Sequence, residues 1–248
     1  MDIEDRVRKY WDVDAQTYDH SPSHVTATAA ERAAWTAALS RHLPPGAKVL
    51  DAGAGTGFMS LLAARIGAQV TALDLSTGML GRLEATASAR GVSVAIVEGD
   101  AAEPPAEIAA RGPFGVVVER HLLWTLPDPG AALAAWRRVA PDGKLLLFEG
   151  LWGEADPVES VRGRLREALR AARGTGPDHH GSYEPDVLER LPLSAGTTPS
   201  RLVELVEGAG WGPARLERLR DVEWARMLAR RPLDRLLGTT PQFLISAG

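Results

Sequence analysis

A glycine-rich segment follows the first strongly apolar run and is the clearest candidate for a ligand site. It reads Asp51-Ala52-Gly53-Ala54-Gly55-Thr56-Gly57, with glycine at every second position after Ala52. Glycine suits a tight turn leaving a strand, because it adopts left-handed backbone angles and lets a ligand press against bare backbone. The spacing differs from the glycine pattern of dinucleotide-binding loops, as in a nicotinamide dehydrogenase. The segment predicts either a nucleotide-binding turn of another kind or a structural turn without a ligand.

Three acids occur where consecutive predicted strands end, at Asp51, Asp74 and Asp100. Open α/β sheets bind ligands at the carboxyl ends of their strands, and a carboxylate after the second strand can accept hydrogen bonds from both ribose hydroxyls. Asp74 could instead cap the following helix, although Ser76 is better placed for that role. The three placements together favour the ligand site over the structural turn.

Candidate general bases follow the later strands. His121 comes directly after the fourth predicted strand, and imidazole is a suitable base near neutral pH. This histidine could instead cap the segment Leu122–Leu126 or pack on Trp124. Glu149 ends the fifth predicted strand and is a second candidate base, or a carboxylate that binds an amine.

Further candidates lie beyond the fifth strand. His179 and His180 fall in the loop Gly174–Ser182, which could close over a substrate or be an exposed polar loop. Tyr183 could orient a substrate or pack against its neighbours. No third residue has the spacing of a metal ligand beside the paired histidines, so we expect no metal site.

Apolar runs alternate with helical segments from residue 47 onward. The predicted strands are Ala47–Asp51, Gln69–Asp74, Val92–Val97, Phe114–Glu119 and Lys144–Glu149. The predicted helices between them are Phe58–Ile66, Thr77–Arg90, Ala102–Ala110 and Gly130–Val139. Apolar strands separated by helices predict an α/β fold with a doubly wound parallel sheet covered on both faces.

The segments outside this core are more varied. We predict helices at the start of Glu4–Asp19 and over Ala29–Leu43, Asp156–Arg173, Pro185–Leu191 and Pro199–Gly208. Ala214–Val222 and Gln242–Ser246 are expected to be two closing strands, with Glu223–Leu237 between them.

Composition narrows the class of protein. The chain has 248 residues, no cysteine and a net charge of −4, with 45% hydrophobic residues. This excludes thiol catalysis and disulfide scaffolds, and the lack of a dense basic block argues against a nucleic-acid partner. We see neither a signal peptide nor an apolar run of membrane-spanning length, and expect a cytoplasmic protein without a membrane partner, monomeric or homodimeric. The many arginines and alanines suggest a GC-rich bacterial genome.

The segment Val49–Gly57 resembles the first motif of the class I S-adenosylmethionine-dependent methyltransferases, in their small-molecule branch. Asp74 matches the ribose-binding acid of that family, and Asp100 with Ala101 matches its adenine-binding step. Several other segments are also similar to family motifs: Ser76, Met79 and Leu80; Leu126–Pro129; Val139–Gly143; and, in an N-terminal lid, Tyr10–Asp12 and Ala15–Asp19.

The resemblance implies a Rossmann-like seven-stranded sheet of order 3-2-1-4-5-7-6 with strand 7 antiparallel. It implies one methyltransferase domain over residues 1–248, with lid helices in 1–43, a cofactor-binding core in 44–152, a helical cap insertion in 153–198 and a closing helix and strands in 199–248. The chain departs from the family at Phe114-Gly115, where an acid usually follows the phenylalanine.

The expected cofactor is S-adenosylmethionine, with S-adenosylhomocysteine as product. The resemblance, together with the strand-end positions, gives these expected cofactor-binding residues: Tyr10, Tyr18, Asp51, Gly53, Ala54, Gly55, Gly57, Asp74, Leu75, Met79, Asp100, Ala101, Glu119 and Arg120. The candidate catalytic residues are His121, Glu149, His180 and Tyr183.

Acidic residues gather in the parts expected to flank the acceptor: Asp12, Asp14, Asp19, Glu119, Glu149, Glu154 and Asp156. Such a charge distribution attracts a cation, and this favours N-methylation of an amine-bearing natural product, such as an amino sugar in antibiotic biosynthesis. O-methylation of a polyketide or sugar hydroxyl is the alternative. A cofactor-binding regulatory subunit without catalytic activity is a second alternative.

Overall fold

The computed structural model describes residues 3–21, 23–150, 157–173 and 183–248. Within these residues, seven strands form one sheet in the order β3-β2-β1-β4-β5-β7-β6. β1 to β5 run parallel, and β7 is antiparallel to both β5 and β6. The strands are β1 Lys48–Ala52, β2 Gln69–Asp74, β3 Ala95–Glu98, β4 Val116–Arg120, β5 Lys144–Gly150, β6 Arg215–Arg218 and β7 Gln242–Ala247. The predicted sheet order and the antiparallel seventh strand are confirmed.

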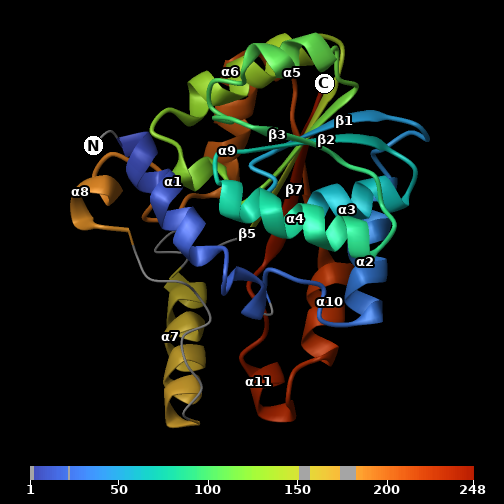
Figure 1. Ribbon diagram of the computed structural model, residues 1–248. Coiled ribbons are helices and arrows are strands. Elements are labelled where there is room, and N and C mark those ends of the chain that lie inside the picture. Colours follow the sequence, from blue (N-terminus) through green and yellow to red (C-terminus); the bar gives the residue numbers. More distant parts are fainter. Residues whose placement is uncertain (1–2, 22, 151–156, 174–182) are drawn as a thin grey trace.

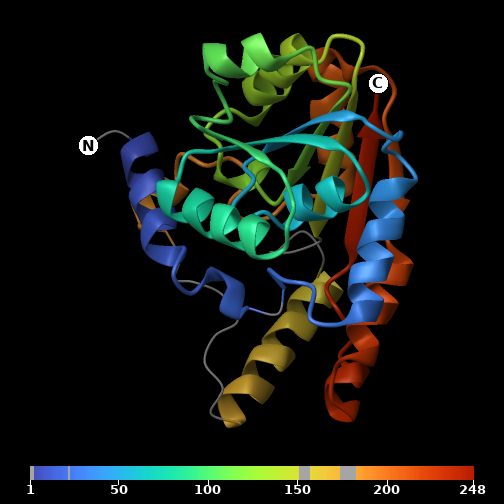
Figure 2. The same cartoon turned by 45° about the vertical axis from the view of Figure 1, so that its right-hand side comes forward.

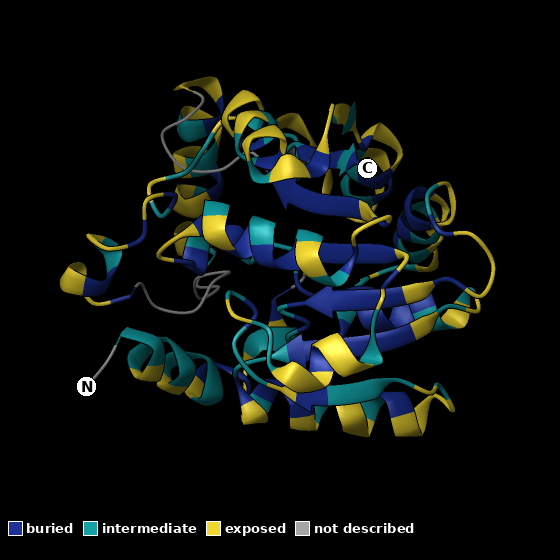
Figure 3. Cartoon of the chain, turned by 90° about the horizontal axis from the view of Figure 1, so that it is seen from above, coloured by how far each residue is buried: buried dark blue, intermediate teal, exposed yellow. Residues whose placement is uncertain are grey.

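Helices cover both faces of the sheet because successive strand residues point to opposite sides. Leu50 packs in one core with Trp136, whereas its neighbour Val49 packs in the other with Trp35. The first face carries α5 Ala106–Arg111, α6 Pro129–Val139 and α9 Pro199–Val206. The second face carries α2 Ala29–Ser40, α3 Phe58–Arg65, α4 Thr77–Ala89 and α10 Arg220–Leu228. Figure 3 shows the strands buried between helices whose outer sides are exposed.

The remaining helices lie outside these two layers. α1 Ile3–Asp14 contacts α4, and α8 Pro185–Leu188 lies near α1 (Figure 1). α7 Pro157–Ala172 and α11 Pro232–Leu236 extend from the lower end of the molecule in Figures 1 and 2. None of the helices described has the length and apolar character needed to cross a bilayer. The division into lid, core, cap and closing segment remains a prediction.

Several predicted boundaries were wrong for local reasons. α5 begins at Ala106, not Ala102, because Pro104 and Pro105 disfavour helical backbone before them. β3 begins at Ala95, since the Val92 amide instead donates to the Ala87 carbonyl and closes the end of α4.

The largest error lies near the end of the chain. β6 ends at Arg218, and Arg220–Val222, predicted as strand, begins α10. The segment Glu223–Leu237, for which no element was predicted, contains the rest of α10 and then α11, which Pro232 starts.

Candidate active site

The glycine loop leaves β1 in a left-handed backbone conformation. Gly53, Gly55 and Gly57 have φ of 69°, 54° and 91°. The Gly53 and Ala54 amides both donate to the Leu73 carbonyl, at 2.8 and 3.0 Å, which fastens the turn to β2. A Cβ atom at Gly53 would lie 2.8 Å from the Leu122 side chain, whereas one at Gly55 would meet open space. The loop therefore needs glycine at Gly53 for packing and presents bare backbone at Gly55.

Asp51 lies at the floor of the site. Its side chain is 2% exposed and accepts a hydrogen bond from Ser60 Oγ at 2.6 Å. Burial raises the pKa of Asp51 to about 7. Asp51 is thus a carboxylate that titrates near neutral pH.

Asp74 joins the end of β2 to the glycine loop. Its two carboxylate oxygens accept from the Gly55 amide at 2.7 Å and from the Ser76 amide at 2.9 Å. The cap of α4 is provided by Ser76, whose Oγ accepts from the Met79 amide at 3.1 Å. The prediction that Ser76, not Asp74, caps this helix is confirmed.

Asp100 occupies the same edge of the sheet, beyond β3. One of its carboxylate oxygens accepts from the Ala102 amide at 2.7 Å, and burial raises the pKa of Asp100. Ala101 is buried, and its carbonyl accepts from Trp136 Nε1 at 2.7 Å. Met79, in the first turn of α4, is buried, and Leu75 is half-buried.

The N-terminal segment is fastened onto this edge by two acids. Asp12 Oδ1 accepts from Ser76 Oγ at 2.6 Å and from the Gly78 amide at 3.0 Å. Asp19, in the short 3-10 helix η1 Tyr18–His20, accepts from Thr56 Oγ1 at 2.7 Å. Asp12 therefore fastens the N-terminal segment, the predicted lid, to the start of α4, and Asp19 fastens it to the glycine loop. Asp14 is buried, and burial raises its pKa.

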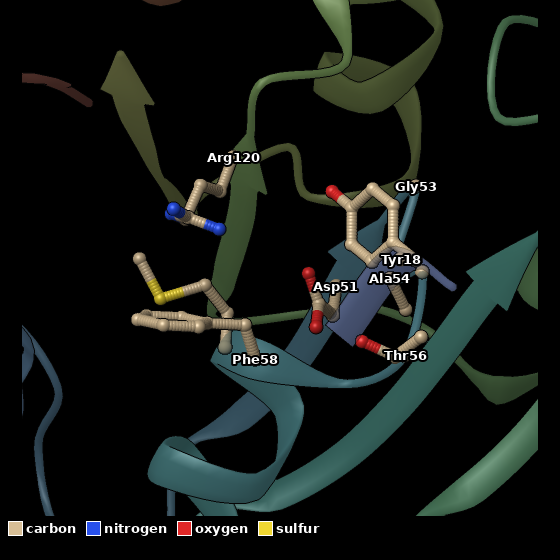
Figure 4. A pocket seen from close by; sticks show the side chains of 9 residues that line it. Tyr18, Asp51, Gly53, Ala54, Thr56, Phe58 and Arg120 are labelled. Carbon is tan, nitrogen blue, oxygen red and sulfur yellow. The ribbon is translucent and has the colours of Figure 1, made fainter. Parts of the chain in front are cut away.

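A small cavity lies between the lid and the loop (Figure 4). Its volume is about 30 Å³, and Tyr18, Asp51, the loop, Phe58, Met59 and Arg120 line it. Ligand pockets of drug-sized molecules measure roughly 300–1,000 Å³. The cavity is therefore smaller than a site that encloses a whole drug-sized ligand. Tyr18 lines this cavity among the described residues and Tyr10 does not.

Arg120 reaches the cavity from the end of β4. Its guanidinium carbon lies 4.1 Å from the centroid of the Phe58 ring and 5.5 Å from that of Trp35. Nη2 donates to the Ser23 carbonyl at 2.7 Å. Burial lowers the pKa of Arg120 to about 10, so the side chain is still cationic at neutral pH.

His121 and Glu149 meet at the ends of adjacent strands. Arg120 pairs with Phe148 in the register of β4 and β5, and this brings the next residues of the two strands together. Nδ1 of His121 lies 3.1 Å from Oε2 of Glu149, whose side chain is buried. His121 also has a φ of 61°, and such left-handed angles in residues other than glycine often occur at functional sites.

Glu119 performs the capping role that was considered for His121. Its carboxylate accepts from the amides of Leu122 and Leu123, the latter at 3.2 Å. Burial and the nearby charge of Glu149 raise the pKa of Glu119 well above its usual range. A direct contact between Glu119 and the cofactor remains a prediction.

Tyr183 packs in an aromatic cluster built from three parts of the chain. Its ring centroid lies 4.4 Å from that of Tyr10 and 5.5 Å from that of Trp124. Trp11 completes the cluster, with its ring centroid 6.2 Å from that of Tyr183. Tyr183 therefore packs against its neighbours, which was one of the two roles considered for it. A role in orienting substrate remains a prediction. His179, His180, Glu154 and Asp156 lie outside the described residues.

The cavity is also lined by Thr56, Phe58 and Met59, which were not among the expected cofactor-binding residues. Thr56 and Phe58 flank Gly57, so the loop motif could have indicated both. Trp35 reaches Arg120 from α2, and no sequence pattern fixes where that helix packs on the sheet.

Comparisons with known proteins agree with this geometry. A family model described as "Methyltransferase domain" matches residues 50–148. Ribosomal protein L11 methyltransferase of Thermus thermophilus is 34% identical over 139 residues, 54% of this chain and 48% of that protein, so the chain spans about half of its length. Ubiquinone biosynthesis O-methyltransferase of Burkholderia pseudomallei is 35% identical over 215 residues, covering 84% of both proteins.

A solved structure shares the fold over the whole chain. Magnesium protoporphyrin IX methyltransferase from Synechocystis PCC 6803, with bound S-adenosylmethionine, has a TM-score of 0.58 at 18% identity, covering 100% of this chain and 97% of that chain. The relative that is 35% identical over 84% of its length shows the family, and the strand-end acids and glycine loop occur where that family needs them. The chain belongs to the class I S-adenosylmethionine-dependent methyltransferases.

Proposed function

We propose that this protein transfers a methyl group to a hydroxyl group of a small molecule, with His121 as the general base. The observation that carries the proposal is the 3.1 Å contact between His121 Nδ1 and Glu149 Oε2 at the edge of the sheet that bears the glycine loop. His121 directly follows β4, which lies next to β1, and Glu149 lies near the end of β5, one strand further along the sheet.

The residues at this edge fit S-adenosylmethionine. Open space at the Gly55 backbone allows close approach of a ligand, and Asp74 and Asp100 provide acceptors for ribose hydroxyls and for an exocyclic amine. When bound, the cofactor supplies a methyl group on a sulfonium, which is an electrophile. Our proposed cofactor residues are the full set expected from the sequence.

His121 is oriented to accept a proton. A buried carboxylate facing Nδ1 favours the tautomer with hydrogen on that nitrogen, which makes Nε2 the basic nitrogen. A positioned general base contributes about 100- to 10,000-fold to the rate. Holding the acceptor in line with the methyl carbon supplies a further contribution through proximity.

Two observations support a hydroxyl acceptor over an amine. Asp12 and Asp19 already have hydrogen-bond partners within the protein, in Ser76 and Thr56, so their presence does not by itself call for a cationic acceptor. The relative aligned over 84% of its length is an O-methyltransferase. An imidazole can accept the proton that a hydroxyl releases as it attacks the methyl group.

N-methylation of an amine is the second candidate. Glu149 is a buried acid beside His121, and a carboxylate at this edge of the sheet favours a cation. The acceptor in either case is proposed to be a bacterial natural product in the cytoplasm, with no nucleic-acid or membrane partner. The net charge of −4 and the absence of a dense basic block support the lack of a nucleic-acid partner.

Matched acceptors test the proposal. Pairs of small molecules that differ only in a hydroxyl or an amine at the same position are incubated with S-adenosylmethionine, and S-adenosylhomocysteine formation is measured. We expect turnover on hydroxyl members and its loss in His121→Asn. Turnover confined to amine members would establish the second candidate, and binding of the cofactor without turnover on any acceptor would favour the regulatory subunit.

A further inference from the structure

Two arginines, Arg120 and Arg226, lie near the ring of Trp35, and within the described residues only one of them bonds a carboxylate. The guanidinium of Arg120 lies 5.5 Å from the ring centroid, and that of Arg226 lies 5.4 Å from it. Both donate to the carbonyl of Ser23, at 2.7 and 3.4 Å. Arg226 also donates to the buried carboxylate of Glu31 at 2.7 Å. Their local settings are therefore similar except for the carboxylate.

Arg120 has no such carboxylate among the described residues. Its Nε is buried without a hydrogen-bond partner there, and the side chain lines the cavity beside the glycine loop. A buried cation with an unused donor is costly unless an anion completes it. The anion that fits must enter the cavity between the lid and the loop.

The other charged group in this cavity is Asp51, which approaches from the neighbouring strand (Figure 4). Asp51 hydrogen-bonds Ser60, and no ion pair joins it to Arg120 within the described residues. Asp51 repels a ligand carboxylate and attracts an ammonium group. The two charges thus favour a zwitterionic amino-acid group in one orientation.

We propose that Arg120 is a specificity-determining residue that binds the carboxylate of the methionine part of the cofactor. This inference rests on the proposed function. Through the Ser23 carbonyl, the same guanidinium also links that carboxylate to the position of residues 18–21, 23 and 24 of the predicted lid. Tyr18 and His24 make this segment a unit, because their rings stack at 3.8 Å and His24 Nδ1 lies 2.8 Å from the Tyr18 carbonyl.

Decarboxylated S-adenosylmethionine provides the test, because it retains the sulfonium and the amine and lacks only the carboxylate. Calorimetric titration of the full chain with both ligands should show that the wild type binds S-adenosylmethionine about 10- to 100-fold more tightly. In Arg120→Gln this preference should fall below about 3-fold, with binding of the decarboxylated ligand nearly unchanged.

Arg226→Gln is the matched control, since Arg226 shares Trp35 and Ser23 but does not line the cavity. We expect it to keep the preference for the carboxylate. Arg120→Lys retains the positive charge but lacks the planar guanidinium that can bond both carboxylate oxygens. This variant should keep part of the preference for S-adenosylmethionine over the decarboxylated ligand.

Hydrogen exchange measures the link to the lid. In the wild type, S-adenosylmethionine should slow exchange of amides in residues 18–24 more than the decarboxylated ligand does, and Arg120→Gln should remove the difference.

The outcomes separate the two proposals. If the wild type binds neither ligand, the proposed function fails together with this inference. If both ligands bind the wild type equally, or if Arg120→Gln weakens both by the same factor, only the role of Arg120 is overturned.

Discussion

His121 combines a left-handed backbone with a contact to a buried acid, and the two features can be tested separately. Asparagine adopts left-handed angles more readily than most residues but is not a base. We expect His121→Asn to keep the free energy of unfolding within about 0.5 kcal/mol while lowering kcat about 100-fold or more. His121→Ala should lose the same activity and about 1 kcal/mol of stability besides.

Urea unfolding and steady-state kinetics of both variants check this expectation. Retention of wild-type kcat in His121→Asn would show that the histidine has a structural role only.

The raised pKa of Asp51 predicts that the free energy of unfolding depends on pH. Burial raises its pKa to about 7, so the folded protein holds a proton that the unfolded chain loses above about pH 4. The stability associated with this proton is fully present below about pH 4 and is lost as the pH rises through about 7. At roughly 1.4 kcal/mol per pKa unit, the wild type should lose on the order of 3 kcal/mol relative to Asp51→Asn between about pH 4 and pH 8.

Chemical denaturation of the two proteins across this pH range measures the difference. A difference that stays constant with pH would mean that Asp51 ionises normally in the folded state.

At the scale of elements, the turn from β1 into α3 depends on Gly57 for more than its backbone angle. Gly57 has a φ of 91°, and a Cβ atom there would lie 2.1 Å from Leu83 Cδ1. Gly91 has a φ of 61° but meets no atom within 4 Å. We therefore expect Gly91→Ala to cost about 1 kcal/mol and Gly57→Ala to cost about 2–4 kcal/mol.

Thermal and urea unfolding measure the loss of stability in both variants. Both substitutions put alanine in a left-handed backbone conformation, so the difference between the two losses gives the cost of the clash with Leu83. Equal losses would contradict a tight contact between the loop and α4.

The lid is held to the glycine loop by the bond from Thr56 to Asp19. Thr56→Val removes this bond while keeping the shape of the side chain, and we expect S-adenosylhomocysteine to dissociate about 5- to 10-fold faster. Arg82→Gln is the comparison, because its 3.4 Å contact with Asp19 is at the surface and should contribute little. Stopped-flow release of the ligand measures both rates, and equal rates in all three proteins would show that this bond does not hold the lid.

At the scale of the molecule, the sheet could be predicted because alternating apolar strands and helices leave few arrangements of a parallel α/β fold. The ends of elements near Pro104 and Arg220 could not, since they depend on turns and on packing between distant segments. Sequence reasoning named both His121 and Glu149 without pairing them. Their contact follows from the register of β4 with β5, which the residues alone do not reveal.

The roles of the lid acids were also beyond the sequence. Asp12 and Asp19 were interpreted as attracting an acceptor, and the sequence did not indicate that they also bind Ser76, Gly78 and Thr56. Where α1 lies is set by its packing on α4, so the partner of each acid appears only in the folded chain.

Transfer of an isotopically labelled methyl group from S-adenosylmethionine, in an extract of the source cells, tests the central claim most directly. The purified protein should place the label in a small molecule, and nuclear magnetic resonance of that product should show the new methyl group on oxygen. His121→Asn should reduce the labelling about 100-fold or more. Label that enters only protein or RNA, or that appears on nitrogen, would contradict methylation of a small-molecule hydroxyl.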